Sequence, residues 1–500
     1  MQQTEKPFRP FWLTPALVAA VVLAQALLRA FIAGQTDLLP DEAYYTQWSF
    51  HPSPGYMDHP PLIAWLIAAG RLVTESSFGV RLAALVSPLL ISLALYRTGT
   101  LLMDRSSALL AVLWYNLSVG LALSLLATPD VPSTLFWMLT AWAVAEFVAG
   151  RNANWWLAVG LFAGLGVLGK YTNLILGVGI LLFILTSRDR WAWLKIWQLW
   201  AGGIVAALVV APNLIWNSQN GWISFTFQGG RIINDPRVTD LGANYLEMLG
   251  AQALFLGPLV VLFFLIATIL YLVRPRQWPQ LAWPVLSGLP ALTYFAIHAS
   301  RARVEANWLL PLWPMATLAA AFVVLAGLHS NAALRFLRGL AVYAQTLFGL
   351  ALTVLLAWIV LARPDALKHL DRTHDMHGWT ETAEALDAIA DEHGASWVAM
   401  PAHYGLVGEF ATYSHFIKSD RPVISVGERQ RYRFEPLDPA ALTFPTILVD
   451  PHDNRAGFEA MFGTIEPLGT IGRRYKGEVL ASYPVYEVSA PTAAFYDAMR

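Results

Sequence analysis

Long apolar runs separated by short polar segments dominate the first 362 residues of the chain. A bilayer core about 30 Å thick needs roughly 20 apolar residues of helix, and about eleven runs approach that length. They cover, approximately, residues 11–33, 78–102, 107–127, 131–149, 154–169, 171–187, 197–216, 244–272, 282–298, 309–328 and 339–361. Gly169-Lys170 is the only polar break within residues 155–186 and predicts a tight hairpin. The pattern predicts a polytopic α-helical membrane protein.

Basic residues in the short loops predict the orientation of these spans. If the N-terminus is cytoplasmic, about twelve Lys and Arg fall on that side and about six on the other. An odd number of spans then places the C-terminus outside. We therefore expect a cytoplasmic N-terminus, an uncleaved first helix and an extracytoplasmic C-terminal region.

The composition changes abruptly after residue 362, where Asp, Glu, His, Arg and Pro become frequent. An amphipathic helix is predicted at residues 379–393. Short apolar segments between Pro and Gly turns predict strands at residues 396–400, 422–426, 446–449 and 479–488. We expect two domains: a transmembrane domain (residues 1–362) and a small extracytoplasmic α/β domain (residues 363–500).

Composition narrows the class of protein further. Hydrophobic residues make up 56% of the chain and charged residues 13%, whereas a soluble domain carries about 25% charged residues. An ordinary soluble protein and a disordered chain are both excluded. The formal net charge of −1 gives no electrostatic argument for nucleic acid. The absence of cysteine excludes disulfides, thiol catalysis and Cys-ligated metals.

The first outer loop, residues 34–79, carries the most distinctive polar residues. It contains Asp41-Glu42-Ala43-Tyr44-Tyr45 and Asp58-His59-Pro60, and Asp130 recurs on the same predicted side. Residues 61–73 are apolar but too short to span, which predicts an interfacial helix. Ionisable groups near a membrane cavity are functional candidates, although a single Asp in a loop is more often simply solvated. A carboxylate pair suits general-base catalysis on a hydroxyl or amine.

Cationic residues are predicted on the same face of the membrane. Arginine binds phosphate through a bidentate fork, and lysine acts as a point charge. Each cation taken alone is equally well explained as an anchor to lipid phosphates. Together they predict a site for a phosphorylated lipid, formed by Lys170, Arg231, Arg301 and Arg303.

These motifs resemble those of a known group of enzymes. The first loop, DEAYYTQWS…GYMDHPPLIAW, resembles the protein O-mannosyltransferase and lipid A aminoarabinose transferase superfamily of membrane glycosyltransferases, which has the GT-C fold. Ordered matches follow in ATPDVPSTLFW, GLFAGLGVLGKYTN, PNLIWNSQNGWISFTFQGGRI, RARVEANWLLPLWP and RPVISVGERQRYRF. The resemblance implies the GT-C fold and a sugar donor linked to polyprenyl phosphate. It also implies the bacterial inner membrane, with the C-terminal domain in the periplasm.

The resemblance also implies roles for individual residues. Asp41 occupies the place of the catalytic base, Glu42 is its neighbouring acid, and Asp130 matches a second family aspartate. The Asp58-His59-Pro60 segment departs from an acidic-Lys-Pro motif, so Lys170, Arg231 or Arg303 would have to supply the missing cation. The expected donor-phosphate or substrate-binding residues are Tyr44, Tyr45, Asp58, His59, Lys170, Arg231, Arg301, Arg303 and Asn307.

The function expected from the resemblance is inverting transfer of the sugar to an extracytoplasmic acceptor. Lipid A, another envelope lipid or a glycan is the favoured acceptor, while a protein O-glycosyltransferase and a lipid-linked sugar flippase stay open as alternatives. The expected partners are the donor, the acceptor and membrane lipids, with no nucleic acid, and the chain is expected to be a monomer. No cofactor is required, and Asp58 would be the ligand if a divalent metal takes part.

Overall fold

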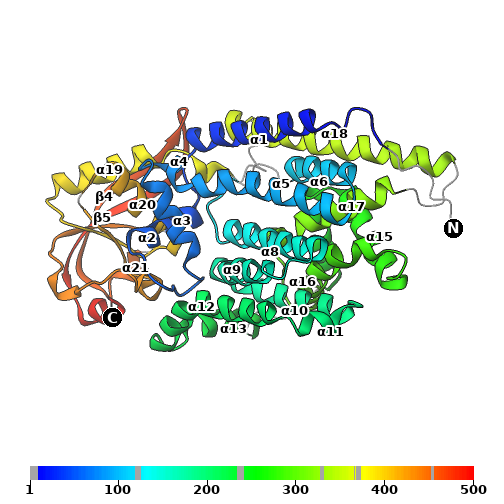
Figure 1. The fold of residues 1–500 in the computed structure, drawn as a ribbon. Coiled ribbons are helices and arrows are strands. Elements are labelled where there is room, and N and C mark those ends of the chain that lie inside the picture. Colours follow the sequence, from blue (N-terminus) through cyan, green and yellow to red (C-terminus); the bar gives the residue numbers. More distant parts are fainter. Residues whose placement is uncertain are drawn as a thin grey trace.

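The computed structural model describes residues 9–118, 125–233, 241–326, 332–364, 366, 373–419, 421–451 and 455–499, without the side chains of residues 231–233, 241 and 332. The long helices run side by side and form an elongated bundle, and a sheet domain lies at one end of it (Figure 1). The N-terminal end of the described chain lies at the opposite end of the bundle from that domain.

The spans follow the apolar runs of the sequence. In the described residues, seven helical segments are long and apolar enough to cross a membrane, or up to eight if one bent pair is a single span. The seven are α1 (Pro15–Gln35), α4 with α5 (Ser77–Val80 and Leu82–Leu102), α8 (Asp130–Gly150), α12 (Trp197–Gln219), η2 with α16 (Pro279–Leu281 and Ala282–Ala299), η3 with α17 (Ala306–Leu312 and Trp313–Leu325) and α18 (Ala332–Ala362). The expected polytopic helical architecture is confirmed.

The other apolar runs contain shorter helices in the described residues, and the run at residues 107–127 continues past Ser118 into residues outside them. α6 (Arg105–Ser118), α9 (Trp155–Gly169) and α10 (Leu174–Thr186) have 14, 15 and 13 residues. A short 3-10 turn, η1 (Tyr171–Asn173), leads into α10, and α11 (Arg190–Leu194) follows it. Among the described residues, fewer helices therefore reach full length than the eleven apolar runs of the sequence.

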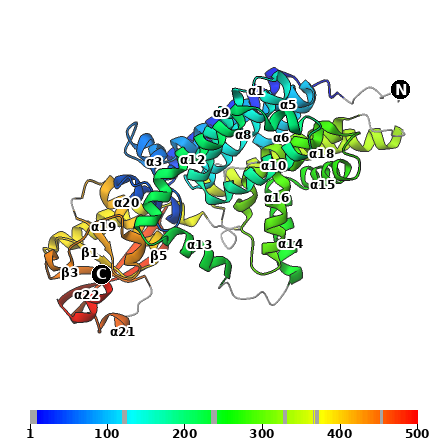
Figure 2. The same ribbon diagram turned by 60° about the horizontal axis from the view of Figure 1, so that its bottom comes forward.

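The run at residues 244–272 is two helices instead of one continuous helix. α14 (Leu241–Phe255) and α15 (Pro258–Val273) meet at 112°. Gly257 between them has a φ of +108°, which an L side chain rarely adopts, and Pro258 starts the next helix. A Cβ at Gly257 would lie 1.9 Å from the Gln345 side chain, so α18 also packs closely here. Figure 2 shows α14 projecting from the bundle.

The chain reverses between α9 and α10, as the polar break predicts. Trp156 at the start of α9 packs on Phe147 with ring centroids 5.1 Å apart. Before α10, the Ser133 hydroxyl donates to Asn173 Oδ1 at 2.6 Å, near the opposite end of α8. After α10, Trp193 returns to Phe147 at 5.2 Å. α10 therefore runs back along the direction of α9.

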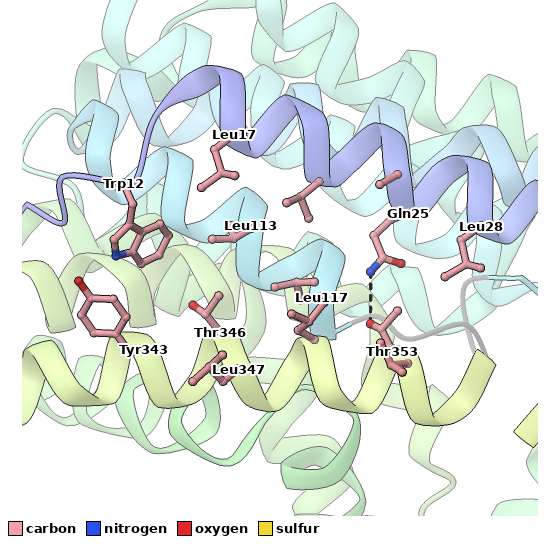
Figure 3. Close-up of a pocket in the computed structure, with 14 residues that line it drawn as sticks. Trp12, Leu17, Gln25, Leu28, Leu113, Leu117, Tyr343, Thr346, Leu347 and Thr353 are labelled. Atoms are coloured by element: carbon pink, nitrogen blue, oxygen red, sulfur yellow. Dashed lines mark hydrogen bonds between the residues drawn. The ribbon is translucent and has the colours of Figure 1, made fainter. Parts of the chain in front are cut away.

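An apolar groove lies between α1, α6 and α18 (Figure 3). It has a volume of about 490 Å³. Leu17, Leu113, Leu117 and Leu347 are among its lining residues. The Gln25 amide donates to Thr353 Oγ1 at 3.2 Å, so the polar groups of this wall satisfy one another. Exposed leucines on α1 and α18 beside the groove suit contact with lipid tails.

The C-terminal region is built on a five-stranded sheet with the order β2-β1-β3-β5-β4. β1 pairs in parallel with β2 and β3, and β5 pairs antiparallel with β3 and β4. The strands are β1 (Val398–Met400), β2 (Val423–Ser425), β3 (Thr446–Val449), β4 (Phe462–Tyr475) and β5 (Glu478–Pro491). Helices in this region are α19 (Trp379–Glu392), α20 (Tyr404–Phe416), α21 (Arg455–Phe458) and α22 (Ala493–Met499), with 3-10 turns η5 (His374–Met376), η6 (Arg429–Tyr432) and η7 (Pro439–Ala441).

One hydrophobic core joins this sheet domain to the first outer loop. Trp379 and Phe410, from α19 and α20, belong to the same buried cluster as Trp48 and Ile63 of the loop. The loop itself contains α2 (Pro40–Phe50) and α3 (Leu62–Arg71), and α3 is the short helix predicted there. Because these elements share a core, polar groups of the loop and of the C-terminal domain are held in fixed relative positions.

Close backbone approach fixes the contact between α2 and α20. A Cβ at Gly408 would lie 2.7 Å from the Tyr44 backbone nitrogen, so a larger residue does not fit there. Thr412, one turn further along α20, donates its hydroxyl to the Ala43 carbonyl at 3.1 Å. α20 therefore lies directly against the start of the helix that carries Asp41 and Glu42.

Candidate active site

The two acids at the start of α2 lie in opposite environments. Both fall in the first turn of the helix, which begins at Pro40, and carboxylates are favoured there by the helix dipole. Successive helical residues point about 100° apart. As a result Glu42 is buried in the protein, whereas Asp41 is exposed at the rim.

Glu42 forms a fully buried ion pair. Its carboxylate accepts from Arg81 Nε at 2.9 Å and from Arg81 Nη2 at 2.7 Å, and both side chains are 0% exposed. The backbone nitrogens of Leu39 and Ala127 donate to the same carboxylate at 3.0 and 2.9 Å. Both oxygens are thus occupied. This environment favours an anchoring role for Glu42 over the catalytic role expected from the sequence.

Asp41 has few partners and an accessible carboxylate. Tyr404, at the start of α20, donates its hydroxyl to Asp41 Oδ1 at 2.9 Å. The surrounding protein removes water from one side of the group, and this desolvation raises the pKa of Asp41; the Tyr404 hydrogen bond and nearby His403 oppose that rise. A raised pKa makes Asp41 a stronger proton acceptor than a freely solvated aspartate.

Asp58 is held between the loop and the C-terminal domain. The Tyr44 hydroxyl donates to Asp58 Oδ2 at 2.7 Å. Arg431 of η6 forms an ion pair with Asp58 Oδ1. Two predicted residues, Tyr44 and Asp58, are therefore brought together, and their cationic partner comes from the C-terminal domain.

Asp130, Lys170 and Asn307 meet, although they are far apart in the sequence. Lys170 Nζ donates to Asp130 Oδ1 at 2.7 Å. The Asn307 amide donates to Asp130 Oδ2, also at 2.7 Å. Asp130 starts α8, Lys170 follows α9, and Asn307 lies in η3, so three separate helices converge here.

The buried ring of Tyr45 links these carboxylates. Burial raises the pKa of the Tyr45 hydroxyl most, and the charges of Asp41, Asp58 and Asp130 raise it further. The His59 ring packs edge-on to the Tyr45 ring at 6.1 Å. Contacts thus join Tyr44 to Asp58 and Tyr45 to His59, and the charges of Asp41, Asp58 and Asp130 all act on Tyr45.

The other predicted cations are placed differently. Arg303 is 63% exposed and pairs with Glu247 of α14 at 2.7 Å. Arg301 is exposed, and its backbone nitrogen donates to the His298 carbonyl at 2.8 Å. Among the ion pairs and hydrogen bonds of the described residues, none joins either side chain to Asp41, Asp58 or Asp130. The backbone of Arg231 lies in α13 (Ile223–Ile233), and its side chain falls outside the described residues.

Reasoning from the sequence missed the contribution of the C-terminal domain. Tyr404 and Arg431 reach Asp41 and Asp58 across more than 360 residues of chain. The stretch that contains Arg431, RPVISVGERQRYRF, is rich in charge for a chain with so little of it. That charge is the signal that points to a site residue.

The described residues do not form a metal site. Within them, no group of three or more His, Asp or Glu side chains is arranged to hold a metal ion. Both Asp58 oxygens already accept from Tyr44 and Arg431.

The amino-acid sequence is similar to those of known membrane enzymes. Residues 58–216 match the family described as dolichyl-phosphate-mannose-protein mannosyltransferase. Lipid A galacturonosyltransferase RgtD from Rhizobium johnstonii is 27% identical over 321 residues, which are 62% of this chain and 66% of that protein. Lipopolysaccharide core galacturonosyltransferase RgtA from the same organism is 26% identical over 215 residues, 41% of each chain.

A solved structure shows the same fold. The crystal structure of ArnT from Cupriavidus metallidurans bound to undecaprenyl phosphate matches 95% of this chain and 98% of that one, with a TM-score of 0.65 and 13% identity. The fold implied by the first-loop motif is therefore confirmed. The chain has the GT-C membrane fold and is related to membrane glycosyltransferases.

Proposed function

We propose that the protein transfers a sugar from a polyprenyl-phosphate donor to lipid A or the lipopolysaccharide core, at the periplasmic face of the bacterial inner membrane. The names of RgtD and RgtA support this acceptor class and make a uronosyl group the first donor to test. The ArnT structure with undecaprenyl phosphate supports a polyprenyl carrier. The aligned regions span 66% and 41% of the two relatives, so the activity is a proposal for this chain.

The observation that carries the proposal is the position of Asp41. It is an accessible carboxylate with a pKa raised by desolvation and further by the nearby charge of Asp58, and it accepts a hydrogen bond from Tyr404 of the C-terminal domain. A general base must reach the proton that it removes. An exposed rim next to a membrane domain lets a lipid-linked donor and an outer acceptor meet at one carboxylate.

The reaction then proceeds as a single displacement. Asp41 takes the proton of the acceptor hydroxyl or amine while that nucleophile forms a bond to the anomeric carbon. The bond from the anomeric carbon to the phosphate oxygen breaks, and the electron pair leaves with the polyprenyl phosphate, with inversion at carbon. The leaving group is already an anion, so nearby cations stabilise it more effectively than an acid would. Lys170, held by Asp130, is one such cation.

The test is transfer by the purified full-length protein in lipid nanodiscs. The protein is given a polyprenyl-phosphate uronosyl donor and lipid A, and mass spectrometry measures the acceptor. The proposal predicts lipid A heavier by one uronosyl residue. Sugar found on protein Ser or Thr when cell extract is supplied as acceptor, or movement of intact donor between leaflets with no covalent product, would instead support the two alternative functions.

A further inference from the structure

We infer that Arg431, carried by the C-terminal domain, binds an oxyanion of the donor, which is either its phosphate or the carboxylate of a uronosyl sugar. The inference deepens the proposed function and rests on it. The basic residue next to Asp58 in the first loop is His59, and a histidine is only partly charged near neutral pH. Arg431 brings a permanent positive charge to Asp58, the residue next to His59.

The surroundings of Arg431 hold its guanidinium in one orientation. The guanidinium carbon lies 4.3 Å from the centroid of the Tyr404 ring and 5.0 Å from that of Phe227. Arginine is more weakly hydrated than lysine and stacks on aromatic faces, which leaves the edge of its planar fork for hydrogen bonds. Phe227 belongs to α13 and Tyr404 to α20, so the membrane domain and the C-terminal domain both hold this side chain.

The charged edge of Arg431 has capacity for a ligand. A guanidinium has five N–H donors. One terminal nitrogen pairs with Asp58, and Nε lies 3.4 Å from Glu428 Oε2. The side chain keeps 16% of its surface exposed. The two carboxylates therefore orient the fork without enclosing it, which is the preorganisation that binding an oxyanion requires.

Arg431 and Asp41, the proposed base, both contact the side chain of Tyr404. The Tyr404 ring that covers Arg431 carries the hydroxyl that donates to Asp41. An oxyanion at Arg431 would therefore lie next to the carboxylate that removes the proton. This places the leaving phosphate, or the acidic group of the sugar, beside the reacting carbon.

The test compares two intact donors in the full-length protein. Their binding is measured in nanodiscs without acceptor, with a uronosyl and a matched neutral hexosyl polyprenyl phosphate. Arg431→Gln should weaken binding about 10- to 100-fold, as expected for loss of a charged hydrogen bond, and Arg431→Lys should weaken it less. Arg433→Gln, two residues along and exposed, is the matched control and should bind as the wild type does.

The two donors identify the oxyanion. Weaker binding of both identifies the phosphate, and weaker binding of the uronosyl donor alone identifies the sugar carboxylate. If Arg431→Gln and Arg431→Lys bind both donors as Arg433→Gln does, the inference is overturned. Donor binding is measured without turnover, so it can be separated from the proposed function. The proposed function is contradicted on its own if the wild type binds the donors but transfers no sugar to lipid A. If Arg431→Gln does not fold, the binding of both donors by Arg431→Lys is compared with that by Arg433→Gln. Weaker binding by Arg431→Lys supports the inference, and equal binding overturns it.

Discussion

Asp41 and Glu42 are neighbours in the sequence, yet they belong to two regions with different tasks. The interior region around Glu42 is closed: Arg81 and two backbone nitrogens satisfy the carboxylate completely. The rim around Asp41 is open, with one hydrogen bond from Tyr404 and a raised pKa. A carboxylate with every partner in place fixes structure, whereas one held by few partners at an exposed rim can exchange a proton.

The largest effect on stability is expected in the interior region, at the buried pair of Glu42 and Arg81. Glu42→Gln leaves Arg81 as a buried charge without a carboxylate, which should lower the free energy of unfolding by about 3–5 kcal/mol. Thermal unfolding in detergent measures this change. The double variant Glu42→Gln/Arg81→Met should lose less than the sum of the two single variants. A Glu42→Gln protein as stable as the wild type would show that the pair is not an anchor.

A second prediction concerns the ion pair between Lys170 and Asp130, at the start of α8. Lys170→Met should lower kcat/KM about 10- to 100-fold, because Asp130 loses a charged hydrogen bond and the leaving phosphate loses a nearby cation. The rate of lipid A modification per folded molecule measures it. Lys170→Met/Asp130→Asn should be little worse than the worse single variant, since both residues act as one unit. If the losses of kcat/KM in the two single variants add up fully in the double variant, Lys170 and Asp130 act independently.

A smaller effect is expected where Tyr404 meets Asp41. The Tyr404 hydroxyl stabilises the ionised carboxylate and lowers its pKa, so Tyr404→Phe should raise that pKa further. The ionised base is then lost at a higher pH, and the acid limb of the kcat/KM profile moves upward. At neutral pH, the loss of this one hydrogen bond should raise the activation free energy for kcat/KM by about 0.5–1.5 kcal/mol. Tyr496→Phe, in α22, is the control, and an acid limb moved to lower pH would contradict the assignment.

The smallest effect is expected for a pair that is exposed on both sides. Arg151 and Asp189 are 59% and 48% exposed and lie 2.8 Å apart. Surface ion pairs contribute about 0–1 kcal/mol, so Asp189→Asn should change the unfolding free energy by less than about 1 kcal/mol. A loss as large as that of Glu42→Gln would show that burial does not separate the two kinds of pair.

The sequence predicts the spans well because apolar length is a local property. It predicts the acids of the site for the same reason, since Asp41, Asp58 and Asp130 stand out in a chain poor in charge. It does not separate Asp41 from Glu42, because the side that each faces depends on the packing of α2. It also misses α20 and Arg431. Gly405 and Gly408 weaken the helical pattern of α20, and Arg431 joins the site only through tertiary packing.

The bend at Gly257 is a further case of tertiary packing. Periodicity alone predicts one long helix at residues 244–272, and the contact of Gly257 with Gln345 of α18 accompanies the division into two. Such breaks arise where a neighbouring helix occupies the space that a straight helix would need.

The transfer rate of purified Asp41→Asn tests the central claim most directly. Asparagine keeps the shape of the side chain but accepts a proton poorly, and a general base contributes about 10²- to 10⁴-fold to a rate. With donor and lipid A at saturation, and a melting temperature within about 2 °C of the wild type as proof of folding, the account predicts a rate about 10²- to 10⁴-fold lower. An Asp41→Asn protein that transfers sugar at the wild-type rate would contradict it.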